Sequence, residues 1–246
     1  MEGKRRLRRA LILLCVLPWL SAAIVSGSDW PMWGYDAARS GAAPAALSLP
    51  DSLHLQWVRE LPPPRRAWRK QRDDGDKLEF DLSYSPVVLD DRVFVSSMTT
   101  DSLTAYAADT GEQLWRFHAD GPARVAPAAW DGKVYFASDD GCLYCLDAAT
   151  GRLRWKFNAA PAEYRVLGNE RVISMWPARG GPVVDDGTVY FAAGIWPWLG
   201  TFVHALDAET GEVRWANTGH ATDWQPQQHA GAFAFAGLAP QGYLAL

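Results

Sequence analysis

Short apolar runs, each followed by a polar pair, recur along the chain. The three best-marked stretches are SPVVLDDRVFVSS (85–97), APAAWDGKVYFAS (126–138) and GPVVDDGTVYFAA (181–193). In each, a proline precedes a short apolar strand, an Asp-Asp or Asp-Gly pair makes a tight turn, and a strand rich in Val, Tyr and Phe follows. The pattern predicts three antiparallel hairpins whose second strands are apolar on both faces.

A second repeated block follows each hairpin. AADTGEQLWRF (107–117), LDAATGRLRWKF (146–157) and LDAETGEVRWAN (206–217) each contain Thr-Gly and, four residues after the glycine, Trp. The two blocks together give four strands in about forty residues, which is the period of propeller blades. We therefore expect an all-β fold, a β-propeller of four-stranded blades that is incomplete in this chain. About three full blades are predicted at 80–120, 124–160 and 180–218, with a partial fourth at 230–246.

The residues of the Thr-Gly turn have a chemical role. Asp147 can accept hydrogen bonds from backbone N–H groups just ahead of it, Thr150 can tie its hydroxyl to the turn, and Gly151 can take the positive φ that closes a hairpin. The first unit lacks the aspartate, so we expect its turn to be held differently. The equivalent residues are Asp207, Thr210 and Gly211 in the third unit and Ala107, Thr110 and Gly111 in the first.

An indole recurs on the last strand of each unit, at Trp115, Trp155 and Trp215. An indole in this position can cover the flat backbone of a neighbouring turn and bury about 200 Å². A single blade cannot hide its own faces, whereas neighbouring blades hide them for each other. We expect these three side chains to lock blades together rather than to carry chemistry.

The first 27 residues differ from the rest of the chain. MEGKRRLRR is basic, ALILLCVLPWL is apolar and SAAIVSG is a run of small residues, an order typical of a cleaved secretory signal. An uncleaved N-terminal anchor is the alternative, because the apolar run is only slightly short of a membrane span. We expect an exported protein, periplasmic or extracellular. Residues 28–79 are expected to form a Trp-rich extension in which LQWVREL (55–61) can act as a closing strand.

Charge narrows the classes of partner. The predicted signal holds five of the 24 basic residues and one of the 28 acidic ones, which leaves 19 Lys and Arg against 27 Asp and Glu, a net charge of −8. Such a surface repels phosphate backbones and anionic lipid. We expect no nucleic-acid partner and no membrane contact beyond the export signal.

The spacing of the cysteines and histidines along the sequence matches no known catalytic arrangement. Cys142 and Cys145 form a CxxC, but positions three apart on the predicted strand point to opposite faces, so we interpret both as small buried hydrophobes. His204 occupies the place of Tyr144 in the preceding unit, which favours a structural role. We expect no catalytic residue and no metal site. The densest polar cluster is His220, Asp223, Trp224 and His229.

The repeated pattern AxDxxTGxxxW resembles the tryptophan-docking motif of pyrroloquinoline quinone (PQQ) repeat β-propellers, over residues 80 to 246. The opening DWPMWGYDAARSG is similar to that of secreted bacterial proteins of this PQQ-like type, and ISMWPARGGPVV and APQGYL resemble a branch associated with planctomycete-type bacteria. In quinoprotein dehydrogenases of this kind, an eight-bladed propeller holds PQQ with calcium, an Asp base, a stacking Trp and a disulfide between adjacent cysteines.

This chain has no adjacent cysteine pair, and the resemblance to the outer-membrane assembly lipoprotein, a scaffold propeller without quinone, implies a different role. The favoured hypothesis is therefore an extracytoplasmic scaffold or binding module with no cofactor, whose partners are envelope proteins or the remaining blades of the same protein. One alternative is a quinoprotein oxidoreductase fragment, a PQQ-dependent dehydrogenase using PQQ and calcium, completed by blades beyond Leu246. A ligand or carbohydrate sensor is the second alternative.

Two insertions break the period. Pro86 to Pro127 spans 41 positions and Pro127 to Pro182 spans 55, so about fourteen extra residues fall in PAEYRVLGNERVISMWPARG, and five more (IWPWL) follow near 195–199. Insertions in propellers map to loops on one face, often a binding face. They would give a ligand rim for an anionic or aromatic compound, or else local ion pairs and aromatic caps over the core. The residues concerned are Arg165, Arg171, Trp176, Arg179, Trp196 and Trp198.

Overall fold

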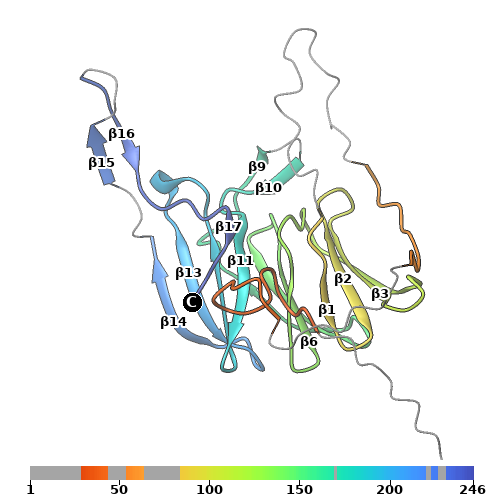
Figure 1. Cartoon of the computed structure of the whole chain (residues 1–246). Helices are drawn as coiled ribbons and strands as arrows, with labels where there is room; N and C mark the ends of the chain where they lie inside the picture. Colours follow the sequence, from red (N-terminus) through yellow and green to blue (C-terminus); the bar gives the residue numbers. More distant parts are fainter. Residues whose placement is uncertain (1–28, 44–53, 64–83, 169–170, 220–222, 227–230) are drawn as a thin grey trace, which may run out of the picture.

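Three sheets dominate the computed structural model, each with four consecutive antiparallel strands, and a short fifth strand is added in parallel to the third sheet (Figure 1). The residues that it describes are 29–43, 54–63, 84–168, 171–219, 223–226 and 231–246. The expected export signal lies outside these ranges. His220 and His229 of the predicted polar cluster also lie outside them. The strands of the first blade are β1 (Val87–Leu89), β2 (Arg92–Ser97), β3 (Ser102–Ala107) and β4 (Gln113–His118). The second blade contains β5 (Ala128–Trp130), β6 (Lys133–Ala137), β7 (Cys142–Asp147) and β8 (Leu153–Asn158). The third contains β11 (Ala178–Asp185), β12 (Thr188–Ala193), β13 (Phe202–Asp207) and β14 (Val213–Thr218).

The fold is therefore all-β and made of propeller blades, as the repeats predict. The first strands of the blades contact one another, β1 with β5 and β5 with β11, so they lie innermost. The fourth strands, β4 and β8, alternate exposed with half-buried residues, while β14 is exposed throughout. Apolar side chains fill the two spaces between blades, with the fully buried Tyr135 and Phe191 between the second and third and Phe94 and Phe136 between the first and second.

The indoles lock consecutive blades together. Trp115 of the first blade donates its Nε1–H to the carbonyl oxygen of Ala148 in the second at 3.1 Å, and Trp155 of the second donates to Ala208 in the third at 3.3 Å. Each indole lies flat against the next turn, because a Cβ built on Gly151 would stand 2.6 Å from the Trp115 ring and one built on Gly211 2.7 Å from the Trp155 ring. A glycine is required there on two grounds, positive φ and this close approach.

The aspartates close these turns as expected. Asp147 Oδ1 accepts hydrogen bonds from the backbone N–H of Thr150 at 3.0 Å and from its hydroxyl at 2.8 Å, and Asp207 Oδ1 makes the same pair with Thr210. Hydrogen bonds from Arg154 and Arg214 respectively are the main cause that lowers the pKa of each carboxyl group to about 2.

The first turn is held differently, by the N-terminal extension. Trp57 donates from its Nε1 to the carbonyl oxygen of Ala108 at 2.9 Å and covers Gly111 at the same 2.6 Å that Trp115 keeps from Gly151. Gln56 and Arg59 donate to the carbonyl oxygens of Asp109 and Gly111, each at 2.6 Å. The segment expected to act as a closing strand thus supplies the indole of a preceding blade, although residues 54–63 form no β-strand.

Residues 29–43 run across the inner strands of all three blades. Trp30 forms an isolated bridge with Val88, Pro31 accepts a hydrogen bond from the N–H of Ala129 at 2.7 Å, and Met32 is buried in the core between the second and third blades. Arg39 donates to the carbonyl oxygens of Pro182 at 3.1 Å and Leu244 at 2.7 Å. The inner strands therefore have a cover that the repeat does not encode.

The last described residues lie against this cover. The segment expected to begin a fourth blade contributes β16 (Phe233–Ala236), which pairs with β15 (Asp223–Pro226), and β17 (Gly242–Tyr243), which runs parallel to β11. Tyr243 stacks on Trp33 with ring centroids 4.3 Å apart. The blade boundaries stay predictions. No helix in the described part of the chain is long and apolar enough to span a membrane.

Candidate functional site

The first insertion folds into a hairpin on one face of the blades (Figure 1), formed by β9 (Arg165–Gly168) and β10 (Arg171–Ser174). Its base is fixed to the second blade, because the N–H of Ser174 donates to the carbonyl oxygen of Asp139 at 2.7 Å. The backbone N–H of Met175 also donates to the carbonyl oxygen of Tyr164 at 2.8 Å and closes the hairpin. The described residues of the insertion are thus held against the second blade by backbone hydrogen bonds.

Beneath the hairpin, two arginines hold one buried carboxylate. Arg179 of β11 donates from Nε to Asp139 Oδ1 at 2.8 Å and from NH2 to Oδ2 at 2.8 Å, while Arg124 donates from Nε to Oδ2 at 2.5 Å. The side chain of Asp139 is 1% exposed and those of the two arginines 7–8%. Burial lowers the pKa of Arg124, opposed by the Asp139 charge. This cluster joins the loop before β5, the β6–β7 turn and the third blade.

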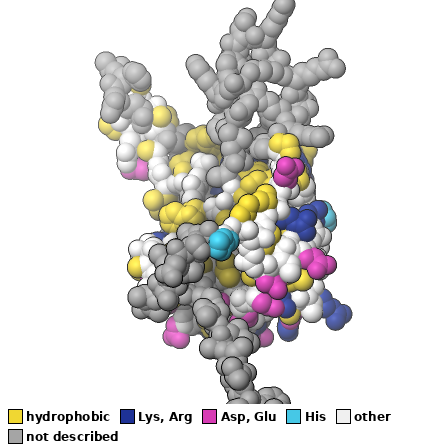
Figure 2. Space-filling view, turned by 45° about the vertical axis from the view of Figure 1, so that its right-hand side comes forward, with side chains coloured by type: hydrophobic (Ala, Val, Ile, Leu, Met, Phe, Trp, Pro, Cys, Tyr) yellow, Lys and Arg dark blue, Asp and Glu magenta, His cyan; other side chains and the backbone are white. Residues whose placement is uncertain are grey.

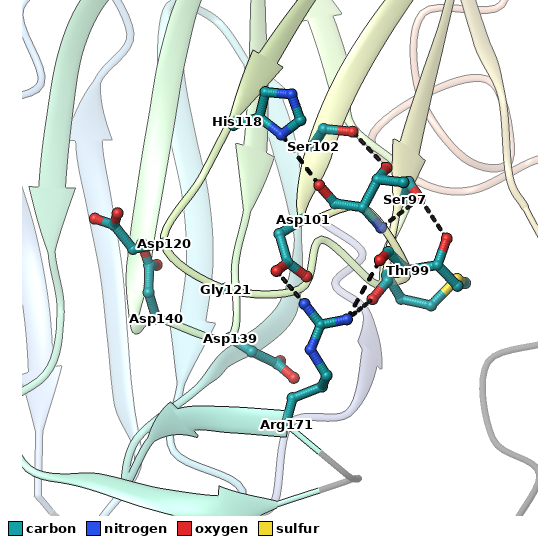
Figure 3. Close-up of polar contacts among 12 residues, drawn as sticks. Ser97, Thr99, Asp101, Ser102, His118, Asp120, Gly121, Asp139, Asp140 and Arg171 are labelled. Atoms are coloured by element: carbon teal, nitrogen blue, oxygen red, sulfur yellow. Dashed lines mark hydrogen bonds and ion pairs between the residues drawn. The ribbon is translucent and has the colours of Figure 1, made fainter. Parts of the chain in front are cut away.

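A second ion pair fastens the hairpin to the first blade. Figure 3 shows the Arg171 side chain extending from β10 to the turn between β2 and β3, where it forms an ion pair with Asp101 and donates to the carbonyl oxygen of Thr99 at 3.3 Å. Burial raises the pKa of Asp101, against the opposing effect of the Arg171 charge. Oδ1 of Asp101 is buried and has no hydrogen-bond partner among the described residues.

The two consecutive carboxylates of the β6–β7 turn, Asp139 and Asp140, have different hydrogen-bond partners. Asp139 is engaged by the arginines, whereas Asp140 accepts hydrogen bonds from the N–H of Cys142 at 3.0 Å and from the hydroxyl of Tyr144. Lys156 stands 3.7 Å from the same carboxylate and 3.1 Å from that of Asp120. In Figure 3, Asp120 and Asp140 lie together, away from Asp101 and Arg171.

The six side chains of the expected rim have different partners and different degrees of burial. Arg171 and Arg179 end in ion pairs, and Arg165 lies exposed on β9 with its NH1 3.5 Å from the carbonyl oxygen of Asp120. Trp176 is buried and donates to the carbonyl oxygen of Leu199 at 2.7 Å. Trp196 and Trp198 flank the start of a short 3₁₀ helix (Pro197–Leu199) and stack on each other, half exposed. A ligand-binding role for these residues stays a prediction.

The carboxylates that organise this face were absent from the predicted set. Asp101, Asp139 and Asp140 lie in the turns between the second and third strands of their blades, and the repeat gives these turns no common residue. Their partners stand 70, 40 and 4 positions away along the chain. The feature of the sequence that could have pointed to them is the pair of consecutive aspartates, Asp139 and Asp140, in the second blade.

The cysteines lie on opposite faces of β7, as the strand pattern predicts. Cys142 belongs to the core shared with the first blade and Cys145 to the core shared with the third. Both are free and buried, and burial raises the pKa of each thiol to about 12. The thiols stay protonated at neutral pH and cannot pair with each other in this fold.

Residues 56–217 match the family described as outer membrane protein assembly factor BamB. Among curated proteins, the alcohol dehydrogenase (quinone) dehydrogenase subunit of Gluconacetobacter polyoxogenes is 35% identical over 150 residues, which cover 53% of this chain and 19% of that protein. The quinohemoprotein alcohol dehydrogenase ADH IIB of Pseudomonas putida is 28% identical over 237 residues, covering 86% of this chain and 31% of that protein. The chain therefore spans less than a third of the length of these relatives.

Among solved structures, the quinohemoprotein alcohol dehydrogenase of Comamonas testosteroni superposes with a TM-score of 0.51 at 24% identity, over 83% of this chain and 28% of that one. This likeness supports the propeller fold.

Proposed function

The chain belongs to the family described as outer membrane protein assembly factor BamB, and from this premise we propose that it is an extracytoplasmic propeller segment acting as a scaffold or binding module. Its partners are envelope proteins, and its contact surface is the β9–β10 hairpin. The observation that carries the proposal is an apolar pair on a braced hairpin: Leu167 and Val172 face each other across the two strands and are 67% and 53% exposed.

The bracing matters because a preordered surface loses little conformational entropy on binding. Arg171 ties the hairpin to the first blade through Asp101, and Ser174 ties it to the second through the backbone of Asp139. An exposed apolar pair held in this way is suited to protein contact. Charged side chains of both signs are interspersed over the face seen in Figure 2, so single-sign electrostatics do not define that face.

The carboxylates of the Asp139 and Asp101 ion pairs are not free to bind the calcium ion of a quinone site. Calcium takes six to eight oxygen ligands, many of them carboxylate. Both oxygens of Asp139 already accept hydrogen bonds from guanidinium groups, and one oxygen of Asp101 is paired with Arg171. Binding calcium at Asp139 would require breaking a buried ion-pair cluster.

The second candidate is a segment of a quinone-dependent alcohol dehydrogenase, favoured by the 35% identity to a protein of that name. Mixing PQQ and calcium with a protein that contains this chain together with the remaining blades required by the second candidate separates the two candidates. Under the scaffold proposal, no bound-quinone absorbance and no ethanol-dependent dye reduction develop. Appearance of both signals would establish the second candidate instead.

The scaffold proposal is tested directly by crosslinking in an envelope fraction. A Leu167→Ser, Val172→Ser double variant is expected to lose the crosslinked species formed by the parent chain. The matched control is Leu153→Ser on β8, which removes an apolar side chain that is 48% exposed on another surface. Equal crosslinking by the hairpin variant and the parent would refute the hairpin as contact surface.

A further inference from the structure

A cavity of about 400 Å³ lies between the outer half of the second blade and the start of the β9–β10 insertion. This volume is within the range of small-molecule sites. The second blade supplies the floor, with Asp140, Lys156 and Asn158, and the insertion supplies the rim, with Glu163, Tyr164 and Arg165. The Asp139 cluster lies outside the cavity lining, as does the Leu167–Val172 pair. The inference therefore goes beyond the proposed function and does not rest on it.

The floor is preorganised. The side chain of Asp140 is 2% exposed and is fixed by hydrogen bonds from the Cys142 N–H and the Tyr144 hydroxyl. Lys156 lies over the Tyr144 ring, 4.8 Å from its centroid, and donates to Asp120 at 3.1 Å. Burial alone would lower the pKa of Lys156, but its hydrogen bonds with Tyr144 and Asp120 outweigh burial, and the pKa is raised. Groups held in place before binding are a requirement of an effective polar site.

Other groups of the cavity, on the rim and at Asn158 of the floor, still have hydrogen-bonding capacity that is not used. Glu163 makes no hydrogen bond or ion pair with any described residue, and the Tyr164 hydroxyl makes none either. The Asn158 side-chain oxygen accepts from the N–H of Ala160 at 2.9 Å, which leaves its amide hydrogens for another acceptor. The Tyr164 side chain lines the cavity and is 63% exposed, so its ring is accessible to a ligand.

The charges of the cavity select the class of ligand. Lys156 forms ion pairs with both Asp120 and Asp140, so the floor has two carboxylates against one ammonium group and carries one net negative charge. Glu163 on the rim is exposed to water, which screens it. An anionic ligand is repelled by this net charge, whereas a hydroxyl group donates to a carboxylate and accepts from an ammonium or amide in one place.

We propose that this cavity binds a neutral polyhydroxyl compound of monosaccharide size. Its hydroxyl groups bridge the Asp120 and Glu163 carboxylates and the Asn158, Lys156 and Arg165 donors, and one apolar face of the ring packs on Tyr164. Cys142 takes no chemical part, since burial keeps its thiol protonated.

The test is titration calorimetry of the full chain with D-glucose, D-galactose, D-mannose and myo-inositol, and with glycine as a zwitterionic probe. At least one polyol is expected to bind with one site per chain, while glycine does not. Glu163→Ala and Arg165→Ala are each expected to weaken that binding about tenfold, as loss of a hydrogen bond to a charged group does. Glu212→Ala and Arg152→Ala, exposed and outside the cavity, leave it unchanged.

Three outcomes overturn the proposal. These are the absence of heat from every polyol, polyol binding that neither cavity variant weakens, and binding of glycine in place of the polyols. Because the variant positions are exposed, unchanged thermal unfolding is expected and shows that any loss of binding comes from the cavity. Protein crosslinking through Leu167 and Val172 is a separate readout, so either result can fail while the other stands.

Discussion

The second and third blades have the same turn and the same indole but different surroundings. The second blade lies between two others, and its Trp155 covers Gly211 of the third. Trp215 of the third blade covers no turn in the described structure and is 53% exposed. The same sequence motif is therefore a lock in one blade and an open surface in the next, because the lock consists of both an indole and the turn it covers.

A second difference concerns one equivalent position on the third strands. Tyr144 in the second blade pairs across the sheet with Lys156 and donates to Asp140. His204 in the third blade pairs with Ala216, and both its ring nitrogens are buried without a hydrogen-bond partner among the described residues. The third blade thus has alanine where the second has the cross-strand cation, and its buried histidine packs against the rings of Phe157 and Phe191.

The largest effect is expected at Asp139, which connects the second blade to the third. Asp139→Asn leaves two buried guanidinium groups without their carboxylate and is expected to lower the free energy of unfolding by about 3–5 kcal/mol. Urea denaturation measures this. The control, Asp120→Asn, breaks an ion pair whose carboxylate is 67% exposed, and a change below about 1 kcal/mol is expected. Equal changes would show that the buried cluster contributes no more than a surface pair.

The indoles provide the next test. Trp155→Ala is expected to cost about 3 kcal/mol, since it removes a large side chain packed between two blades. Trp215→Ala is expected to cost less than about 1 kcal/mol, because that side chain is half exposed. Both values come from urea denaturation of the full chain. A loss at Trp215 as large as that at Trp155 would contradict the assignment of Trp215 as an undocked indole.

A third test isolates the close approach of the indole to glycine. Gly151 and Gly132 have nearly the same φ, +70° and +68°, but a Cβ at Gly132 has no atom within 4 Å. Gly132→Ala is expected to cost about 1 kcal/mol from the backbone alone. Gly151→Ala is expected to cost about 2 kcal/mol or more, because its Cβ also meets Trp115. Thermal unfolding distinguishes the two, and identical losses would mean that the ring moves aside freely.

The smallest expected effect is the pH dependence of stability that comes from the buried His204. Burial lowers the pKa of His204 below its ordinary value of 6.5, so the unfolded chain binds this proton more readily than the folded one. Stability is therefore expected to fall as the pH drops below about 6.5, and His204→Phe is expected to reduce that fall. The free energy of unfolding at pH 7 and pH 5 measures it, with His118→Gln as the control. A pH dependence that the His204 variant leaves intact would exclude this histidine as its source.

Prediction from the sequence succeeded for contacts between residues whose separation along the chain is set by the repeat. Trp115 and Gly151 lie in consecutive units, so the period alone places the indole near the next turn, and the hairpins follow from their Asp-Gly and Asp-Asp pairs. The ion pairs of the insertion were not predictable in this way. Arg171 and Asp101 lie 70 positions apart in segments with no shared pattern, and only the folded arrangement of blades brings them together.

The cover formed by residues 29–43 has a consequence for the order of folding. Arg39 contacts backbone carbonyls 143 and 205 positions further along the chain. During synthesis from the N-terminus, this segment is made before all three blades yet cannot reach its final place until Pro182 and Leu244 have been translated. Contacts of such long separation form slowly, so the earliest described segment of the protein is expected to be among the last to settle.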